Sequence, residues 1–241
     1  MKYAVDLHIH SALSPCADKD MTPNNIVNMA LVKGLDIIAL TDHNSGANLE
    51  AADKCAKSSG LLLVPGMEVE TSEEVHLICL LPNLKFAAEL NHHIFHSLPD
   101  MKNREDIFGK QIILDENDKI TGEEKRMLIT ATCLSVNDIF LLVKQLNGVV
   151  LPAHVDRPSN SMISNLGMIP EDLDIKYLEI SRNCDEYAFR ALKPELESYR
   201  LIKSSDAHYL GDLLERESLL DLKERSAEAV IDKLNQVCND M

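Results

Sequence analysis

Short apolar runs alternate along this chain with stretches in which apolar residues recur at the period of a helix. Apolar runs bounded by turn-forming residues are typical of buried β-strands. Such runs occur at residues 3–8, 36–41, 61–69, 75–81, 148–153, 176–180 and 201–204. Strands separated by helical segments predict an α/β fold, with a parallel sheet or a barrel.

Residues that begin and end helices agree with this alternation. Thr22 is placed to cap a helix that starts at Pro23 and stops before Gly34, because proline favours the first helical position and glycine the residue past the end. Ser135 and Gly148 bracket another helix in the same way. Two more helix ends are marked by Gly60 and Ser226.

The stretch from about residue 86 to residue 132 breaks the alternation. We predict a small inserted helix followed by a hairpin, with strands at Gln111–Leu114 and Arg126–Ile129 on either side of the polar turn 116–119. Neither an internal repeat nor a low-complexity linker separates this insertion from the rest. We therefore expect residues 1–241 to form a single domain.

Acidic residues outnumber basic ones, with 39 Asp and Glu against 24 Lys and Arg, for a formal net charge of −15. An acidic exterior repels polyanions, so we expect no groove for duplex DNA unless bound metal supplies a positive field. No apolar run approaches the length of a membrane span, and no leader is recognisable at the start, which predicts a cytoplasmic protein without a membrane partner. The six cysteines show no C-x-x-C spacing, so reduced thiols are expected.

His8 and His10 stand at the end of the first predicted strand. Alternate residues on a strand share a face, so the two imidazoles could hold one metal ion. By itself an H-x-H pattern is weak, and two partly exposed histidines are an equally good interpretation.

Polar residues also lie at the ends of the next three predicted strands. Asp42 and His43 follow residues 37–41, Glu68 follows residues 61–67, and His76 opens the next apolar run. A charge at the end of a buried strand is costly unless a partner or ligand satisfies it. Capping of the following helix is an alternative role for Asp42. A carboxylate can bridge two cations and an imidazole cannot, so Glu68 is predicted to be the bridging ligand.

The second half of the chain repeats this pattern. His154 follows the strand at 148–153, and Asp206 and His208 form a D-x-H pair after the strand at 201–204. The carboxyl ends of parallel strands are where α/β folds place active sites, so the joint pattern is stronger than any one of its members. The remaining histidines lie in a predicted helix without an H-E-x-x-H motif and are expected to be exposed: His92, His93 and His96.

With these residues assembled, the sequence resembles the PHP (polymerase and histidinol phosphatase) superfamily of metallophosphoesterases. The resemblance is carried by Asp-Leu-His-Ile-His-Ser at 6–11, Thr-Asp-His-Asn at 41–44, Gly-Met-Glu at 66–68, Pro-Ala-His-Val-Asp-Arg at 152–157 and Ser-Asp-Ala-His at 205–208. It implies a distorted, TIM-like (βα)7 barrel with two to three divalent metal ions at the carboxyl ends of the strands. The ligands that it implies are His8, His10, His43, Glu68, His76, His154, Asp206 and His208.

One departure from the family pattern affects the first motif. Many members continue it with a Ser-Asp-Gly run whose aspartate is a further ligand, whereas this chain has Ser-Pro-Cys-Ala-Asp at 14–18. Asp18 or Cys16 is the candidate to replace that ligand.

Imidazoles mixed with carboxylates suit Zn²⁺, Mn²⁺ or Fe²⁺ better than Ca²⁺ or Mg²⁺, which prefer oxygen ligands. We expect a metal-activated hydroxide to attack phosphorus, with Arg157 and Arg182 binding the phosphate. A surface salt bridge is the alternative role for Arg157. Catalytic roles are assigned to Arg157, Glu68 and His208, and the expected substrates are small phosphate monoesters, nucleotides or short single-stranded oligonucleotides.

Three other functions stay open at this point. Histidinol phosphate is another substrate of the family. A metal-dependent amidohydrolase also uses barrels with H-x-H strands, although the D-x-H ending and the missing strand-borne lysine count against it. A regulatory metal-binding module without catalysis would be indicated by degraded ligand positions, and here they are intact.

Overall fold

A computed structural model of the protein describes residues 1–236. Six strands form one curled sheet in the order β10-β1-β2-β3-β4-β7. Their bounds are β1 Lys2–Ile9, β2 Ile37–Leu40, β3 Leu62–Glu70, β4 His76–Leu80, β7 Val149–Pro152 and β10 Leu219–Asp221. Two more strands, β8 (Tyr177–Ser181) and β9 (Arg200–Ser204), pair in parallel beside this sheet. The seven strands predicted outside the insertion are all present.

The strand directions explain why the sheet is mixed. β1, β2 and β3 run parallel, whereas β4 is antiparallel to both β3 and β7. Only residues 71–75 connect β3 to β4. A parallel pair needs a crossover of about a dozen residues or more, so this short turn forces a hairpin.

Hydrogen bonds at one end join the two sheets into a partial barrel. The N–H of Val155, just after β7, donates to the carbonyl of Glu179 on β8 at 2.9 Å. After β9, the carbonyl of Ala207 accepts the N–H of His10 at 3.0 Å. The mixed α/β fold with a curled, TIM-like sheet is confirmed, while closure into a complete (βα)7 barrel stays a prediction.

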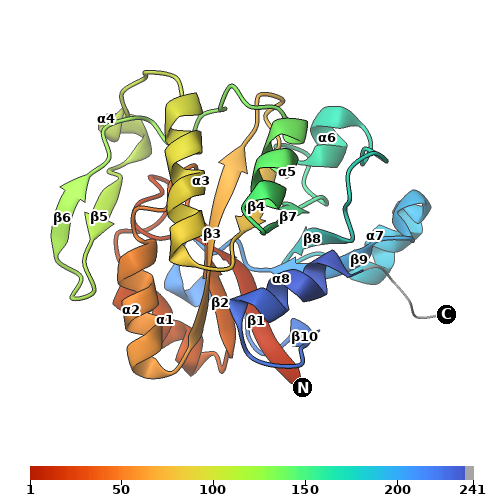
Figure 1. The fold of residues 1–241 in the computed structure, drawn as a ribbon, viewed down its shortest axis with the longest axis horizontal. Coiled ribbons are helices and arrows are strands. Elements are labelled where there is room, and N and C mark those ends of the chain that lie inside the picture. The colour runs from red at the N-terminus through yellow and green to blue at the C-terminus, as the bar shows by residue number, and fades with distance from the viewer. Residues whose placement is uncertain (237–241) are drawn as a thin grey trace.

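Helices cover the outer face of the sheet, as Figure 1 shows for α1, α2, α3 and α5. The helices are α1 Pro23–Val32, α2 Leu49–Ser59, α3 Leu84–Ser97, α4 Glu105–Phe108, α5 Val136–Gln145, α6 Met162–Leu166, α7 Glu186–Leu192 and α8 Ala227–Asn235. The predicted caps are confirmed: Thr22 accepts the N–H of Asn25, Ser135 forms a capping box with Asp138, and Gly60 ends α2 with a φ of 77°. Ser226 caps α8 in the same way.

Apolar side chains fill the interior of the partial barrel below the strand ends. Val5, Val64, Ile78 and Leu151 belong to one buried cluster, and α8 packs its apolar face against that cluster. A second, larger cluster lies between the outer face of the sheet and helices α1, α2, α3 and α5. The barrel interior is thus a packed core, which leaves the strand ends as the place for polar side chains.

The insertion differs from its prediction in one strand. β5 (Ile112–Leu114) pairs with β6 (Ile120–Glu123), so the expected second strand at Arg126–Ile129 was wrong. The carboxylate of Asp115 accepts the N–H groups of Asn117 and Lys119, both at 2.9 Å, and this closes the turn early enough for pairing to start at Ile120.

The structure tests in part the expectations about membrane spans and cysteines. Within residues 1–236, no helix is both long enough and apolar enough to cross a membrane. The five cysteines of that part of the chain are free thiols, and Cys238 lies outside the described residues. Cytoplasmic localisation and the single-domain organisation stay predictions.

Candidate metal centre

The two histidines of β1 reach the barrel interior through an irregularity of the strand. The register of β1 against β2 shifts between Asp6 and Ile9, where β1 has one extra residue. Such a bulge re-aims the side chains that follow it. Leu7 belongs to the interior apolar cluster, and His8 and His10 are fully buried with their Nε2 atoms 3.1 Å apart. The prediction that they project the same way is confirmed.

Glu68 lies at the centre of the polar strand ends. Its Oε1 atom is 2.8 Å from Nδ1 of His76 and 3.3 Å from Nε2 of both His8 and His154. Its Oε2 atom is 2.9 Å from Nδ1 of His43. Gly66 permits this position on β3, because a Cβ there would come within 2.7 Å of the Thr41 methyl group.

Asp206 is the second carboxylate of the group. Its Oδ1 atom lies 3.2 Å from Nε2 of His8, 3.0 Å from Nε2 of His10 and 3.6 Å from Nδ1 of His208. Its Oδ2 atom pairs with Nη1 of Arg157 at 2.6 Å. Eight of the nine residues predicted to bind metal therefore meet in one place.

Three overlapping sets have ligand atoms close enough together to hold a metal ion. They are His10, His43 and His208; His8, His10, Glu68 and Asp206; and His43, Glu68 and His76. His154 joins through its contact with Glu68. His76 comes to this edge although it opens its strand, because β4 runs antiparallel to β3.

The buried polar atoms fit bound cations. Among residues 1–236, Oε2 of Glu68, Oδ1 of Asp206 and Nδ1 of His154 are buried and form no hydrogen bond of good geometry, although imidazole nitrogens lie close to both carboxylate oxygens. Unsatisfied buried polar groups are rare because each costs about 1–3 kcal/mol, and more when charged. Oxygen and imidazole atoms that converge in this way satisfy the preferences of Zn²⁺, Mn²⁺ or Fe²⁺.

Charges in the group shift the pKa values of its histidines in opposite directions. Burial disfavours the charged form of His10, but the neighbouring carboxylates of Asp206 and Glu68 outweigh burial and raise the pKa of His10 to about 9. Burial, with nearby His10, lowers the pKa of His43 and of His208 to about 4. The imidazoles around Glu68 outweigh its burial and hold the pKa of that carboxyl well below its usual range.

The backbone is unusual at two of these positions. His154 and Asp206 have φ angles of 31° and 51°, in the left-handed region that costs a residue with a side chain roughly 1–2 kcal/mol. Strained residues of this kind cluster at functional sites, where the surrounding structure holds them.

Asp18 is not part of this group. Its carboxylate accepts the N–H of Asp20 at 2.8 Å, and neither Asp18 nor Cys16 belongs to the three sets of potential ligands. The Cys16 residue is exposed on the loop that follows β1.

Asp42 has a different role from the helix cap considered above. Its carboxylate accepts hydrogen bonds from the backbone and hydroxyl of Ser11, at 2.7 and 2.6 Å, and from the hydroxyl of Ser14 at 2.6 Å. Helix α2 begins only at Leu49, too far along the chain for Asp42 to cap it. Asp42 instead fixes the loop that follows β1.

Glu179 was missed by the reasoning from sequence. It lies on β8, is 1% exposed, and its Oε1 atom is 2.9 Å from Nδ1 of His8. Burial lowers the pKa of His8, but the charges of Glu179, Asp206 and Glu68 outweigh burial and raise it well above its usual range. The available signal was a single acidic residue inside the apolar run 177–180.

The two predicted phosphate-binding arginines lie on the same side of the group. The Arg157 side chain is 40% exposed, and Arg182 donates to the carbonyl of Asp212 and pairs with its carboxylate, both at 2.8 Å. Arg157 lines both a small cavity of about 150 Å³ above Glu68 and a neighbouring cavity of about 450 Å³ that Arg182 also lines. Arg157 does form a salt bridge, but its partner Asp206 is buried, so the contact is not the surface salt bridge considered as its alternative role.

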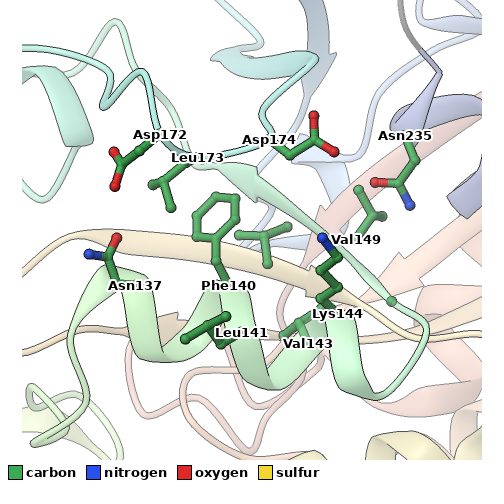
Figure 2. Close-up of a pocket in the computed structure, with 12 residues that line it drawn as sticks. Asn137, Phe140, Leu141, Val143, Lys144, Val149, Asp172, Leu173, Asp174 and Asn235 are labelled. Carbon is green, nitrogen blue, oxygen red and sulfur yellow. The ribbon is translucent and has the colours of Figure 1, made fainter.

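The remaining histidines and another groove lie elsewhere. His92, His93 and His96 are exposed on α3, as expected. A groove of about 440 Å³ lies between α5 and residues 172–174. Figure 2 shows Phe140 and Leu173 approaching each other there. It reaches Val149 at the start of β7, whereas His154 follows the end of that strand, so the groove is remote from the metal centre.

Three known proteins illustrate what this chain is similar to. The 5'-3' exoribonuclease of Haemophilus influenzae is 35% identical over 78 residues, which cover 31% of this chain and 27% of that protein. The 3',5'-nucleoside bisphosphate phosphatase of Chromobacterium violaceum is 33% identical over 79 residues, which cover 32% of this chain and 27% of that protein. The crystal structure of the lesion-specific endonuclease Q from Pyrococcus furiosus superimposes with a TM-score of 0.72 at 20% identity, over 98% of this chain and 56% of that one.

These comparisons bear on fold and family more than on substrate. The matched stretches span about a quarter of the length of the two curated relatives. The similarity to endonuclease Q, at 20% identity, shows a shared fold. Residues 6–150 match the family described as PHP domain. This segment makes up more than half of the chain and contains the β1 histidines, His43, Glu68 and His76. The chain therefore belongs to the PHP domain family.

Proposed function

We propose that this chain is a metal-dependent phosphoesterase that hydrolyses small phosphate monoesters or nucleotides, short oligonucleotides included. The observation that carries the proposal is the convergence of six imidazoles and two carboxylates at one edge of the curled sheet. Within the described residues 1–236, two oxygens of these carboxylates are buried without a hydrogen bond, and bound cations would compensate for the lost hydration.

The proposed ligands divide among two or three ions. Glu68 belongs to two of the three ligand sets and contacts histidines from different strands through each of its oxygens, which supports a bridging role. His10 also belongs to two sets. Eight ligands exceed what one tetrahedral or octahedral ion accepts, so more than one ion is proposed.

Bound divalent ions would supply positive charge for the phosphoryl oxygens and lower the pKa of a water molecule in the site. The chain's own contribution is to hold and orient the phosphate. Arg157 presents a partly exposed guanidinium beside Asp206 and can donate to phosphate oxygens with the N–H groups that Asp206 does not accept. His208, 23% exposed and stacked on His10 at 4.3 Å, stands at the open side, where a ligand or proton-transfer role is proposed.

The shape of the site supports a small substrate. The cavity of about 150 Å³ bordered by Glu68, His208 and Arg157 suits a phosphate group. The adjoining cavity of about 450 Å³ has mainly polar walls, with Arg182, Ser181 and Asn183, and is proposed to take the remainder of the substrate. Arg157 and Asp206 border both cavities, so one substrate can reach from one into the other.

The names of the relatives agree with a phosphoester substrate. The two curated relatives are named as an exoribonuclease and a nucleoside bisphosphate phosphatase, and both reactions hydrolyse phosphate esters. A solved endonuclease Q complex contains a duplex with an abasic lesion, so the expectation that duplex DNA is excluded stays untested for this chain.

Metal content and turnover measured on the same preparation test the proposal. The parent protein should contain two to three equivalents of Zn²⁺, Mn²⁺ or Fe²⁺ and hydrolyse members of a panel of sugar phosphates, mononucleotides and short oligoribonucleotides. A matched control is the double variant His92→Ala/His96→Ala, which removes exposed histidines from α3 and should leave both readings unchanged. One equivalent or less of metal in an active enzyme would contradict the multi-ion centre, and a fully loaded protein without turnover on any phosphate ester would contradict the activity.

A further inference from the structure

Glu179 occupies a position that needs an explanation. It is 1% exposed on β8, between the buried residues Leu178 and Ile180. An ionised carboxylate in such a place is unfavourable unless its partners compensate for the lost water. Its Oε1 atom contacts Nδ1 of His8 at 2.9 Å and accepts the backbone N–H of His154 at 3.1 Å, while Oε2 is buried with no hydrogen-bond partner in the described part of the chain.

The contact with His8 determines which ring nitrogen is available to a metal ion. An ionised carboxylate only accepts hydrogen bonds, so Nδ1 of His8 must carry the hydrogen. The free lone pair of the neutral ring then belongs to Nε2, which lies 3.3 Å from Oε1 of Glu68 and 3.2 Å from Oδ1 of Asp206. That nitrogen points into the ligand set that His8 shares with His10, Glu68 and Asp206.

We infer that Glu179 is a positioning residue of the metal centre, which fixes the tautomer and ring orientation of His8 so that Nε2 faces the cation. The inference deepens the proposed function, because it rests on a metal ion being bound by His8. Carboxylates that orient a metal-binding histidine contribute roughly 10- to 100-fold to metal affinity in other proteins.

The second histidine of β1 is supported differently. Nδ1 of His10 lies 3.0 Å from the hydroxyl of Ser14, which donates to Asp42 at 2.6 Å. The charge of Asp42 therefore reaches His10 only through a hydroxyl group, whereas Glu179 contacts His8 directly. This difference separates the two histidines experimentally, because Ser14→Ala should disturb His10 and leave His8 unchanged.

Glu179 also holds the loop that bears His154. The accepted N–H is the backbone group of His154 itself, whose φ of 31° is in the left-handed region. Glu179→Gln keeps an oxygen acceptor of the same shape but removes the charge, whereas Glu179→Ala removes both contacts. Alanine should therefore impair the centre more than glutamine.

The test uses zinc and needs no substrate. Competition with a chromophoric chelator should show a zinc affinity reduced roughly 10- to 100-fold in Glu179→Gln and further in Glu179→Ala. In the zinc-loaded parent labelled with ¹⁵N-histidine, the ring signals of His8, assigned by their loss in His8→Asn, should show a proton on Nδ1 and a metal-bound Nε2.

A neighbouring buried residue gives the control for lost stability. Leu178→Ala removes a fully buried side chain next to Glu179 and should lower the thermal midpoint without changing zinc affinity or the His8 signals. Parental zinc affinity in both Glu179 variants, or a proton on Nε2 of His8 in the loaded parent, would overturn the inference. Since no reading depends on turnover, failure of the phosphoesterase proposal would leave this result separately interpretable.

Discussion

Removal of Arg157 separates substrate binding from metal binding. The guanidinium donates to Oδ2 of Asp206 at 2.6 Å, whereas Oδ1 of that carboxylate faces His8 and His10. Arg157→Ala therefore leaves the metal-facing oxygen in place. Loss of a preorganised donor to a developing anion costs roughly 10²- to 10³-fold in rate, so kcat/KM should fall at least about 100-fold at unchanged metal content.

The same contact sets the expected effect on stability. A hydrogen bond between charged groups contributes roughly 1.5–3 kcal/mol, and the lower value applies because the Arg157 side chain is 40% exposed. For a domain of this size each kcal/mol shifts the thermal midpoint by roughly 2–4 °C, so the metal-free variant should melt about 3–6 °C below the parent.

Steady-state kinetics and elemental analysis on one preparation distinguish the outcomes. Arg157→Lys should recover part of the activity, because an ammonium group keeps the charge but loses the fork geometry. Arg182→Ala is the matched comparison, since Arg182 is bound to Asp212 on the far side of the larger cavity, and its effect should be smaller. Full activity of Arg157→Ala on every ester that the parent cleaves would refute the phosphate-binding role and leave only the contact with Asp206.

Four further predictions concern the metal ions and the metal-free centre. Glu68→Gln should lower the occupancy of two ions together in elemental analysis, because a neutral amide bridges cations poorly; loss of a single ion would deny the bridging role. Asp18→Asn should leave metal content unchanged, since the Asp18 carboxylate is engaged by the N–H of Asp20, and a lost ion would return Asp18 to the ligand set. His10 has a pKa of about 9 when metal is absent, so it is protonated at pH 7 and must lose a proton to bind a metal ion. Metal affinity should therefore rise from pH 7 to pH 9. Calorimetry in two buffers of different ionisation enthalpy should detect the released proton. In the metal-free protein the raised pKa of His10 stabilises the fold below about pH 6.5, and this contribution disappears as the pH rises through 9. The thermal midpoint of the metal-free protein should therefore fall between pH 6.5 and 9. An increase over that pH range would count against the raised pKa of His10.

Much of the fold and the set of candidate ligands could be predicted from the sequence, because both depend on local patterns. Strands buried on both faces appear as apolar runs, and the candidate ligands follow or open those runs. The direction of β4 was not predicted, although the connection from β3 has only five residues and is too short for a parallel crossover. β10 was not predicted, because it has only three residues and pairs with β1, from which it is separated by most of the sequence.

The groups behind the candidate ligands could not be predicted in the same way. Glu179 and His8 are separated by 171 positions, and their contact exists only once β8 lies beside β7 and the end of β1. The role of Asp42 likewise depends on the loop of Ser11 and Ser14, which folds back over the strand ends. Apolar periodicity gives the position of a strand but not the partner of a buried polar side chain.

Backbone strain at the strand ends connects these supporting carboxylates with the metal centre. His154 and Asp206 both adopt positive φ angles, an arrangement that neither residue favours in isolation. Glu179 accepts the N–H of His154, and Asp6 accepts the N–H of Ser205, the neighbour of Asp206, at 3.0 Å. Two buried acidic residues thus stabilise the loops that carry His154 and Asp206 toward the candidate metal centre. The unfavourable backbone conformation is held by these contacts at the positions where the proposed chemistry needs it.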